Sequence, residues 1–384
     1  MKKGGLYLFG LVVAALVALG LVVLTSASGS NAARLHHGDV YFFMKRQFVY
    51  LGVGIAIAVV MALFDYRKWR EHWLFSVLFY AFVFALLWLV FREKAINGSH
   101  RWIKLGPVNL QPSEFAKLAT VIIVSVFLDK AGWRVEQFVR GAVCPALFIG
   151  LMALPVMLEP DFGSTMVVAL SGFLVMFVAG VRILHFLPFL LAGGAAVGYK
   201  VFTNANRMAR IFAFMGYQPS SIADSASGVA DAAAERAAYQ AEQSLVAIQR
   251  GGVYGVGLRN SMQKYLYLPE AHTDFIFAIG AEELGLTFTI SVIVLFCMFF
   301  GLSIWIARCA TDRLGRYLAF GMAFLIFFQA VFNLGVVCEA LPTKGMALPF
   351  FSYGGTNMLS AFFAVGTILS VGLHSTKKKF RVES

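Results

Sequence analysis

The chain carries little charge for its length. Of its 384 residues, only 14% are Asp, Glu, Lys or Arg, whereas 59% are hydrophobic. A soluble domain has about 25% charged residues. Because so few charges cannot cover the surface of a soluble protein of this size, the composition excludes a water-soluble globular fold and makes lipid the solvent for much of the chain.

Cysteine and acidic residues are also scarce. The four cysteines lie in or beside apolar runs without the spacing of a metal site, so we interpret them as buried small hydrophobic residues. With 32 Lys and Arg against 20 Asp and Glu, the net charge is +12. The cations fall in short segments between apolar runs and not along one amphipathic face. We therefore expect them to orient the chain and to contact anionic headgroups, and we expect no nucleic-acid binding.

Long apolar runs are what the sequence has in abundance. A run of about 20 residues crosses a bilayer, and such runs predict about ten transmembrane helices. The predicted fold class is an all-α integral membrane protein, with residues 1–384 as one polytopic domain. The predicted helices are 6–26, 47–64, 72–91, 114–130, 141–158, 164–181, 183–202, 275–305, 316–338 and 348–373. The first follows Met1-Lys2-Lys3 and lacks a convincing cleavage site, so we expect a signal anchor.

The distribution of Lys and Arg predicts the orientation. With the N-terminus inside, the short segments on the cytoplasmic side carry most of these cations, which places both termini in the cytoplasm. Residues 203–273 then form one large extracytoplasmic loop. Within it, 220–238 are low in complexity and rich in Ala, Ser and Asp, which predicts a flexible or loosely helical insert.

Two polar stretches lie between the early helices. In GSHRWIKLGPVNLQPSEFAK, residues 98–117, the Gly and Pro content predicts a loop, and Glu114 and Lys117 can pair at i and i+3. This pair either steadies the helix start or belongs to a network that shapes a cavity floor, while Arg101 and Lys104 are candidates for anion contact. In EPDFGST, residues 159–165, two acids could bind a cation, but two carboxylates alone are weak evidence for a metal, and a turn with solvated acids is favoured.

Asp274 is the main catalytic candidate. It stands at a predicted helix start in LPEAHTDFIFAIGAEELG, residues 268–285. It either caps the helix, which would stabilise it by about 1 kcal/mol, or acts as a general base at the lipid–water boundary. Two turns deeper, Glu282 and Glu283 cannot both face lipid, so at least one must meet the protein interior or a neutralising partner.

The stretch LPTKGMALPFFSYGGTNM, residues 341–358, predicts an ordered outer loop or a broken helix. Lys344 falls on the same membrane face as Asp274. Contact with lipid headgroups is the simpler interpretation of this lysine alone. An acid and cations on one face also suit an enzyme that acts on a phosphorylated lipid, because the carboxylate takes a proton and the cations hold the departing pyrophosphate.

These motifs together resemble one known family. GSHRWIKLGPVNLQPSEFAK, EPDFGST, GGVYGVGLRNSMQKYLYLPEAHTDFIFAIGAEELG and NLGVVCEALPTKGMALPFFSYGG are similar to the signature segments of the SEDS proteins of cell shape, division and sporulation. The resemblance covers about residues 98–373. YLPEAHTDFIF and LPTKG are more similar to the division branch (FtsW-like) than to the elongation branch (RodA-like). Two departures are SYGGTN, where SYGGSS is more usual, and the insert 220–238.

The resemblance implies a SEDS fold of ten transmembrane helices and peptidoglycan glycosyltransferase activity. The substrate would be lipid II, polymerised into glycan strands at the outer face of the bacterial cytoplasmic membrane. Asp274 would deprotonate the acceptor 4-hydroxyl, with Glu114 and Lys117 as a structural pair. The partners would be a class B penicillin-binding protein (an FtsI-like transpeptidase) and other division proteins. Candidate substrate contacts are Arg101, Lys104, Arg207, Arg210, Lys264, Lys344 and Ser352.

Two alternatives from other classes stay open. One is a lipid II flippase, since broken helices and intramembrane acids also suit transport. The other is a non-catalytic scaffold of the division machinery, in which Asp274 is only a helix cap. No cofactor or metal site is predicted with certainty, and a divalent cation that assists the pyrophosphate is a further open alternative.

Overall fold

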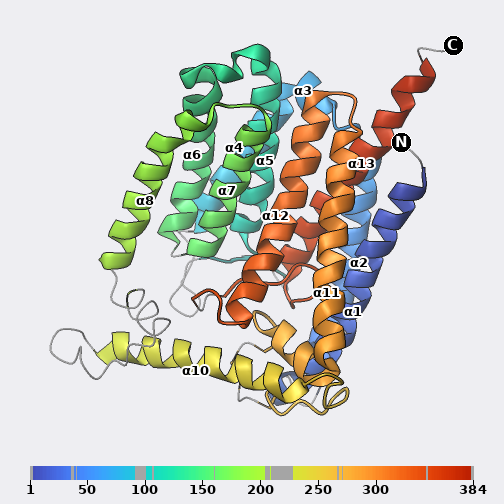
Figure 1. Cartoon of the computed structure of the whole chain (residues 1–384), viewed down its shortest axis with the longest axis vertical. Helices are drawn as coiled ribbons and strands as arrows, with labels where there is room; N and C mark the ends of the chain where they lie inside the picture. The colour runs from blue at the N-terminus through green and yellow to red at the C-terminus, as the bar shows by residue number, and fades with distance from the viewer. Residues whose placement is uncertain are drawn as a thin grey trace.

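Long helices that stand side by side make up most of the molecule (Figure 1). This computed structural model describes residues 3–35, 39, 41–90, 101–105, 108–159, 161–203, 208, 228–265, 268–269, 271–342 and 345–381. The α-helices are α1 (Lys3–Leu35), α2 (Phe42–Leu63), α3 (Lys68–Glu71), α4 (Trp73–Val90), α5 (Pro112–Ala131), α6 (Cys144–Leu158), α7 (Phe162–Val178), α8 (Leu187–Phe202), α10 (Gly228–Gly251), α11 (Ile276–Arg308), α12 (Arg313–Val337) and α13 (Gly355–Arg381). A 3₁₀-helix (Gly132–Glu136), a π-helix (Phe138–Val143) and a second 3₁₀-helix (Ile183–Phe186) connect some of them.

Each of the ten predicted ranges corresponds to a helix in the structure. Within the described residues, seven helices are long and apolar enough to cross a membrane by length and composition. Shorter apolar helices occupy Phe162–Val178 and Ile183–Ala195. The prediction of an all-α polytopic membrane protein is confirmed, and the number ten stays a prediction.

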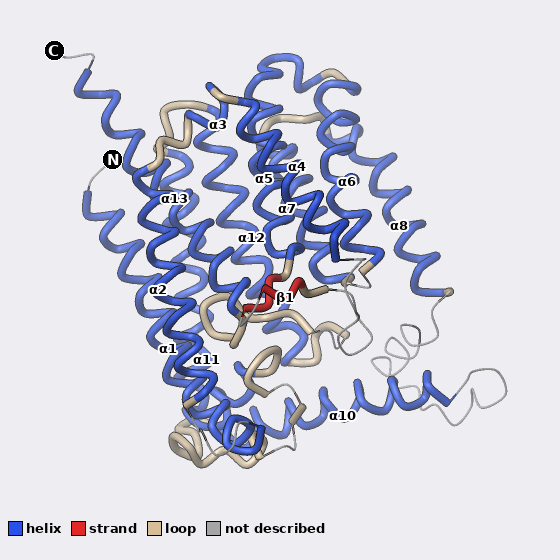
Figure 2. The backbone as a smooth tube through the Cα atoms, turned by 180° about the vertical axis from the view of Figure 1, so that it is seen from behind, coloured by secondary structure: helices blue, strands red, loops and turns tan. Residues whose placement is uncertain are grey.

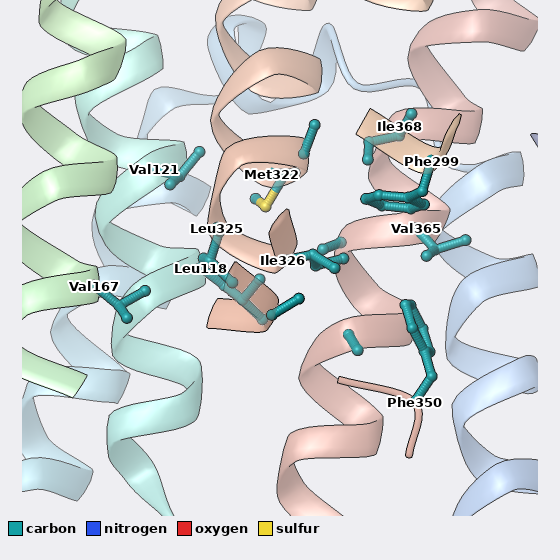
Figure 3. Close-up of a cluster of buried hydrophobic side chains, with 14 of the residues drawn as sticks. Leu118, Val121, Val167, Phe299, Met322, Leu325, Ile326, Phe350, Val365 and Ile368 are labelled. Atoms are coloured by element: carbon teal, nitrogen blue, oxygen red, sulfur yellow. The ribbon is translucent and has the colours of Figure 1, made fainter. Parts of the chain in front are cut away.

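The core lies where α5 and α12 meet the surrounding helices. Figure 3 shows apolar side chains from α5, α7, α11, α12 and α13 pointing toward one another. Leu118 and Ile326 are almost fully buried there. Leu147 and Leu154 of the peripheral α6 are more than half exposed, as lipid-facing residues are. The polar residues of α5 therefore lie inside the bundle, which is why they need partners.

α10 lies in the predicted extracytoplasmic loop, of which residues 220–238 were expected to be flexible or loosely helical. Residues 228–251 form one continuous helix that crosses one end of the bundle at a steep angle to the other helices (Figure 1). Its Ala-rich sequence favours helix, and two of its own residues, Ser244 and Ala247, are fully buried against the rest of the protein. The Ser244 hydroxyl donates to the Val337 carbonyl at the end of α12, 2.8 Å away. α1 begins and α13 ends at the opposite end of the bundle.

Three smaller differences shape the same end of the molecule. The last helix begins at Gly355 and not at 348, because Leu348–Gly354 form turns. A two-stranded antiparallel hairpin, β1 (Ile103–Leu105) with β2 (Val108–Leu110), occupies the predicted loop before α5 (Figure 2). α11 is bent at Gly285, where φ is 69°, a backbone conformation that glycine adopts without strain. Next to this bend, the Leu286 amide donates to the Gly252 carbonyl at 3.0 Å.

Candidate active site

Asp274 is half-buried in a turn that precedes α11. The N-cap of that helix is Phe275, which makes no side-chain capping bond, so Asp274 lies one residue outside the cap position. Its carboxylate lies against the backbone of Gly345, since a Cβ added to that glycine would overlap with the Asp274 carboxylate. Glycine at position 345 leaves room for this carboxylate, and a larger residue there would require the Asp274 side chain to move.

A loop far away in the sequence, at residues 348–353, holds the Asp274 turn. The Ser352 hydroxyl donates to the Thr273 carbonyl at 2.5 Å and accepts from the Leu348 amide at 2.7 Å. The Tyr353 amide donates to the His272 carbonyl at 3.0 Å. Ser352 is 1% exposed. It was predicted as a substrate contact, and these bonds favour a role in holding the turn.

The Asn333 side chain of α12 adds a further connection. Its amide nitrogen donates to the Asp274 carbonyl at 2.8 Å and to the Met346 carbonyl at 2.6 Å. Sequence reasoning missed this residue. The available signal was that Asn333 and Gln329, one turn apart, are uncharged polar residues in an otherwise apolar helix, where such groups are costly and need partners.

Glu114 and Lys117 form a buried ion pair within α5, with 2.7 Å between Nζ and Oε1. Lys117 also donates to the Gln329 side chain at 3.1 Å, and the Ser360 hydroxyl donates to Glu114 at 2.9 Å. Gln329 in turn donates to the Ala347 carbonyl and to Asn357 Oδ1, each at 3.0 Å. The pair is thus linked through one amide to the loop that lies against Asp274.

The β1–β2 hairpin is attached to the start of α13. The Thr356 hydroxyl donates to the Asn109 carbonyl at 3.2 Å and accepts from the Gln111 amide at 3.1 Å. Thr356 and Asn357 are the residues at which SYGGTN departs from the more usual motif, and both side chains are used here. Arg101 donates from Nε to the Glu159 carbonyl at 3.2 Å. Lys104 lies in β1, and its side chain falls outside what the structure describes.

The acids of EPDFGST are buried, so the expectation of solvated acids was wrong. Asp161 caps α7 by accepting from the Ser164 amide at 3.2 Å. Glu159 is 1% exposed, and among the described residues neither of its carboxyl oxygens has a hydrogen-bond partner. Burial and the nearby Asp161 raise the pKa of Glu159 to about 8, against the smaller opposing effect of Arg101. This side chain is therefore mostly uncharged at pH 7.

Glu282 and Glu283 are both buried, and each has partners. Glu282 accepts from the Ser261 hydroxyl and from the Met262 amide. Glu283 accepts from Lys264 Nζ at 2.9 Å and from the Ser26 hydroxyl at 2.6 Å. Lys264 was predicted as a substrate contact, and the structure places its ammonium group, 5% exposed, in this ion pair.

Three predicted substrate contacts, Arg207, Arg210 and Lys344, lie outside the described residues. Lys344 directly precedes Gly345, which does contact Asp274. In the described part of the chain, no group of three or more His, Cys, Asp and Glu side chains could hold a metal ion.

Comparison with known proteins gives consistent matches over nearly the whole chain. Residues 7–377 match the family model of the cell cycle proteins FtsW, RodA and SpoVE. The chain is 36% identical to "Probable peptidoglycan glycosyltransferase FtsW" of Coxiella burnetii over 93% of each chain. It is 38% identical to the protein of the same name from Trichlorobacter lovleyi, over 94% of this chain and 91% of that one.

A solved structure gives the same result at the level of the fold. The chain superposes with a TM-score of 0.74 and 25% identity on a chain from "Structural coordination of polymerization and crosslinking by a peptidoglycan synthase complex", covering 96% of this chain and 98% of that one.

Proposed function

Because the chain belongs to the FtsW, RodA and SpoVE family of cell cycle proteins, we propose that it is a peptidoglycan glycosyltransferase that polymerises lipid II during septal cell-wall synthesis. The resemblance to the division branch of the SEDS family, drawn from motifs, agrees with relatives that are named FtsW. The named activity of those relatives supports the reaction. One observation supports the assignment of the site: the carboxylate of Asp274 lies against Gly345, and the turn that carries it is held by two segments, α12 at Asn333 and the loop at Ser352.

The proposed reaction is an inverting glycosyl transfer. The acceptor 4-hydroxyl oxygen attacks the anomeric carbon of the donor, and its proton passes to the Asp274 carboxylate. The bond from that carbon to the pyrophosphate oxygen breaks, and undecaprenyl pyrophosphate leaves with the electron pair. A carboxylate suits the base because it accepts the proton only as the hydroxyl becomes acidic in the transition state. Cations near the leaving group stabilise its growing negative charge.

Arg101 is the described cation that best fits the anion-binding role. It is half-buried, and it lies beside the Glu159–Asp161 turn, next to the hairpin that contacts α13. Lys104 and Lys344 flank the same region by their places in the chain and complete the proposed set, with Arg207 and Arg210. A divalent cation that assists the departing pyrophosphate stays a prediction.

The site is proposed to face the outside of the bacterial cytoplasmic membrane, with both termini in the cytoplasm. α1 begins and α13 ends at the end of the bundle opposite α10 and the start of α11, which agrees with the charge distribution (Figure 1). The proposed partners are a class B penicillin-binding protein that crosslinks the new strands, and other division proteins. The solved complex that this chain resembles coordinates polymerisation and crosslinking.

The test is a purified complex of the full chain and its transpeptidase in liposomes that contain labelled lipid II. We expect Asp274→Asn to lose polymer formation by about three orders of magnitude, as for loss of a general base, with an unchanged thermal unfolding midpoint. Full polymer from the folded variant would exclude Asp274 as base. Lipid II translocation without any polymer from the wild-type complex would favour the flippase, and neither activity would favour the scaffold.

A further inference from the structure

The strongest unassigned feature near the site is the buried amide of Asn333. This side chain comes from α12 and is 2% exposed. Its two N–H groups serve two backbone carbonyls, one at Asp274 and one at Met346, at 2.8 and 2.6 Å. An amide nitrogen has two donors, so this nitrogen is fully used. The Asn333 oxygen is buried without a hydrogen-bond partner in the described part of the chain.

The two carbonyls belong to segments that approach each other only in the folded protein. One segment ends at Asp274, and the other begins at Gly345, whose backbone contacts the Asp274 carboxylate. Because Met346 directly follows Gly345, a donor shared between the Asp274 and Met346 carbonyls sets the separation between the aspartate backbone and that glycine. Asn333 thus helps to set the distance between the Asp274 backbone, which carries the carboxylate, and Gly345.

Gln329 acts on the same loop one turn earlier in α12. It donates to the Ala347 carbonyl, the neighbour of the carbonyl that Asn333 holds. It is also tied to Lys117, so that its position is fixed by the buried ion pair. The two amides therefore hold consecutive carbonyls of the loop to one rigid helix. Of the two, only Asn333 also reaches the Asp274 backbone among the hydrogen bonds of the described residues.

We propose that Asn333 is a positioning residue for the glycosyl transfer: its amide joins the Asp274 and Met346 carbonyls and thereby places the carboxylate of the base, an assignment that rests on Asp274 being that base. The Ser352–Thr273 hydrogen bond does not involve Asn333. When the Asn333 amide is removed, the turn therefore stays attached at Thr273, the residue before Asp274. The carboxylate then moves without the site unfolding. A displacement of about 1 Å at a reacting group costs about a hundredfold in rate.

The experiment uses the full chain in complex with its transpeptidase, in liposomes with lipid II. For Asn333→Ala, we expect kcat to fall about a hundredfold, with KM within about twofold because substrate contacts are untouched. Asn333→Asp places a carboxyl against two carbonyl oxygens in a buried site. The protonated form is favoured there, so this variant offers one donor in place of two, and its kcat should lie between those of Asn333→Ala and the wild type.

The matched controls are Asn260→Ala and Asn260→Asp. Asn260 is an exposed asparagine whose amide donates to the Val256 carbonyl at 3.1 Å, in a loop without contact to Asp274 among the described hydrogen bonds. Both controls should keep the wild-type kcat. If Asn333→Ala does not fold, Asn333→Gln retains an amide but displaces it, and its folded fraction should show the same loss of kcat.

Two results overturn the inference: a wild-type kcat in the folded fraction of the Asn333 variants, or a loss confined to KM. Failure of the proposed function is distinguished by the Asp274→Asn variant. If that variant is inactive while Asn333→Ala is fully active, only the positioning role is wrong. If Asp274→Asn polymerises normally, the base assignment itself is wrong.

Discussion

Two buried lysine–glutamate pairs in this molecule have nearly the same geometry and different surroundings. Lys117 and Glu114 are 2.7 Å apart with side chains 2% and 7% exposed, and Lys264 and Glu283 are 2.9 Å apart with side chains 5% and 1% exposed. Removing one partner of such a pair leaves an uncompensated buried charge. Burial and distance alone therefore predict similar contributions to stability.

The difference lies in what the remaining hydrogen bonds of each lysine reach. Lys117 donates to Gln329, which holds the loop at Ala347 beside Asp274. Lys264 donates to Ser26 of α1, and its partner Glu283 lies within α11 beyond the first two turns. The first pair supports the site, and the second joins α1 to the loop that crosses the end of α11. The comparison predicts that the neighbours of a buried ion pair, and not its own strength, decide whether the pair affects the proposed reaction.

Lys117→Met should give the largest effect, on stability and on activity together. Glu114 is left buried without its cation, and we expect the free energy of unfolding to fall by about 3–5 kcal/mol. Gln329 also loses its fixed partner, so polymerisation per folded molecule should fall as well. Chemical unfolding in detergent and initial polymerisation rates measure the two effects separately.

The double variant Glu114→Gln/Lys117→Met is the control for charge. Because removal of both charges of a buried pair is far less costly than removal of one, most of the stability should return. The activity should stay low, since Gln329 is still without its lysine. Wild-type activity per folded molecule in either variant would contradict the link between this pair and the site.

Lys264→Met should lower stability to a similar extent and leave the activity of the folded protein near that of the wild type. The reason is that the described hydrogen bonds of the Lys264 ammonium group lead to Ser26 of α1 and to Glu283. Unfolding and polymerisation are measured as for Lys117→Met. Lys45→Met is the control for a lysine pair in solvent, with Lys45 69% exposed, and should cost less than about 1 kcal/mol. A loss of activity without a loss of stability would instead make Lys264 a substrate contact, as the sequence predicts.

The same two pairs show what the sequence could reveal about this molecule. The Glu114–Lys117 spacing lies within one helix, so a local rule finds the pair. The Lys264–Glu283 pair forms across a loop whose path no local pattern defines, and sequence reasoning assigned that lysine to substrate.

Asp274 was found because a carboxylate next to an apolar helix is conspicuous. Asn333 was missed because its role depends on two carbonyls that only the fold brings together. Helices follow from apolar run length, whereas α10 is too poor in apolar residues to be found that way.

Glu159 is also buried but, unlike Glu114 and Glu283, it has no lysine partner among the described residues. It shows how burial without such a partner changes the pKa of a carboxyl group. Burial and Asp161 raise its pKa from 4.5 to about 8. Between those values the folded protein binds a proton that the unfolded chain releases. The contribution of this group to stability is therefore highest below about pH 4.5 and falls as the pH rises toward 8.

Glu159→Gln removes this pH dependence. The variant should equal the wild type within about 0.5 kcal/mol at pH 4, where Glu159 is neutral in the folded protein and mostly neutral in the unfolded chain, and should be the more stable of the two at pH 8. Thermal unfolding midpoints at pH 4, 6 and 8 measure the difference, with Glu136→Gln, an exposed acid paired with Arg182, as the control that should show no such trend. Equal pH dependence in wild type and Glu159→Gln would mean that Glu159 is charged in the folded protein and has a partner after all.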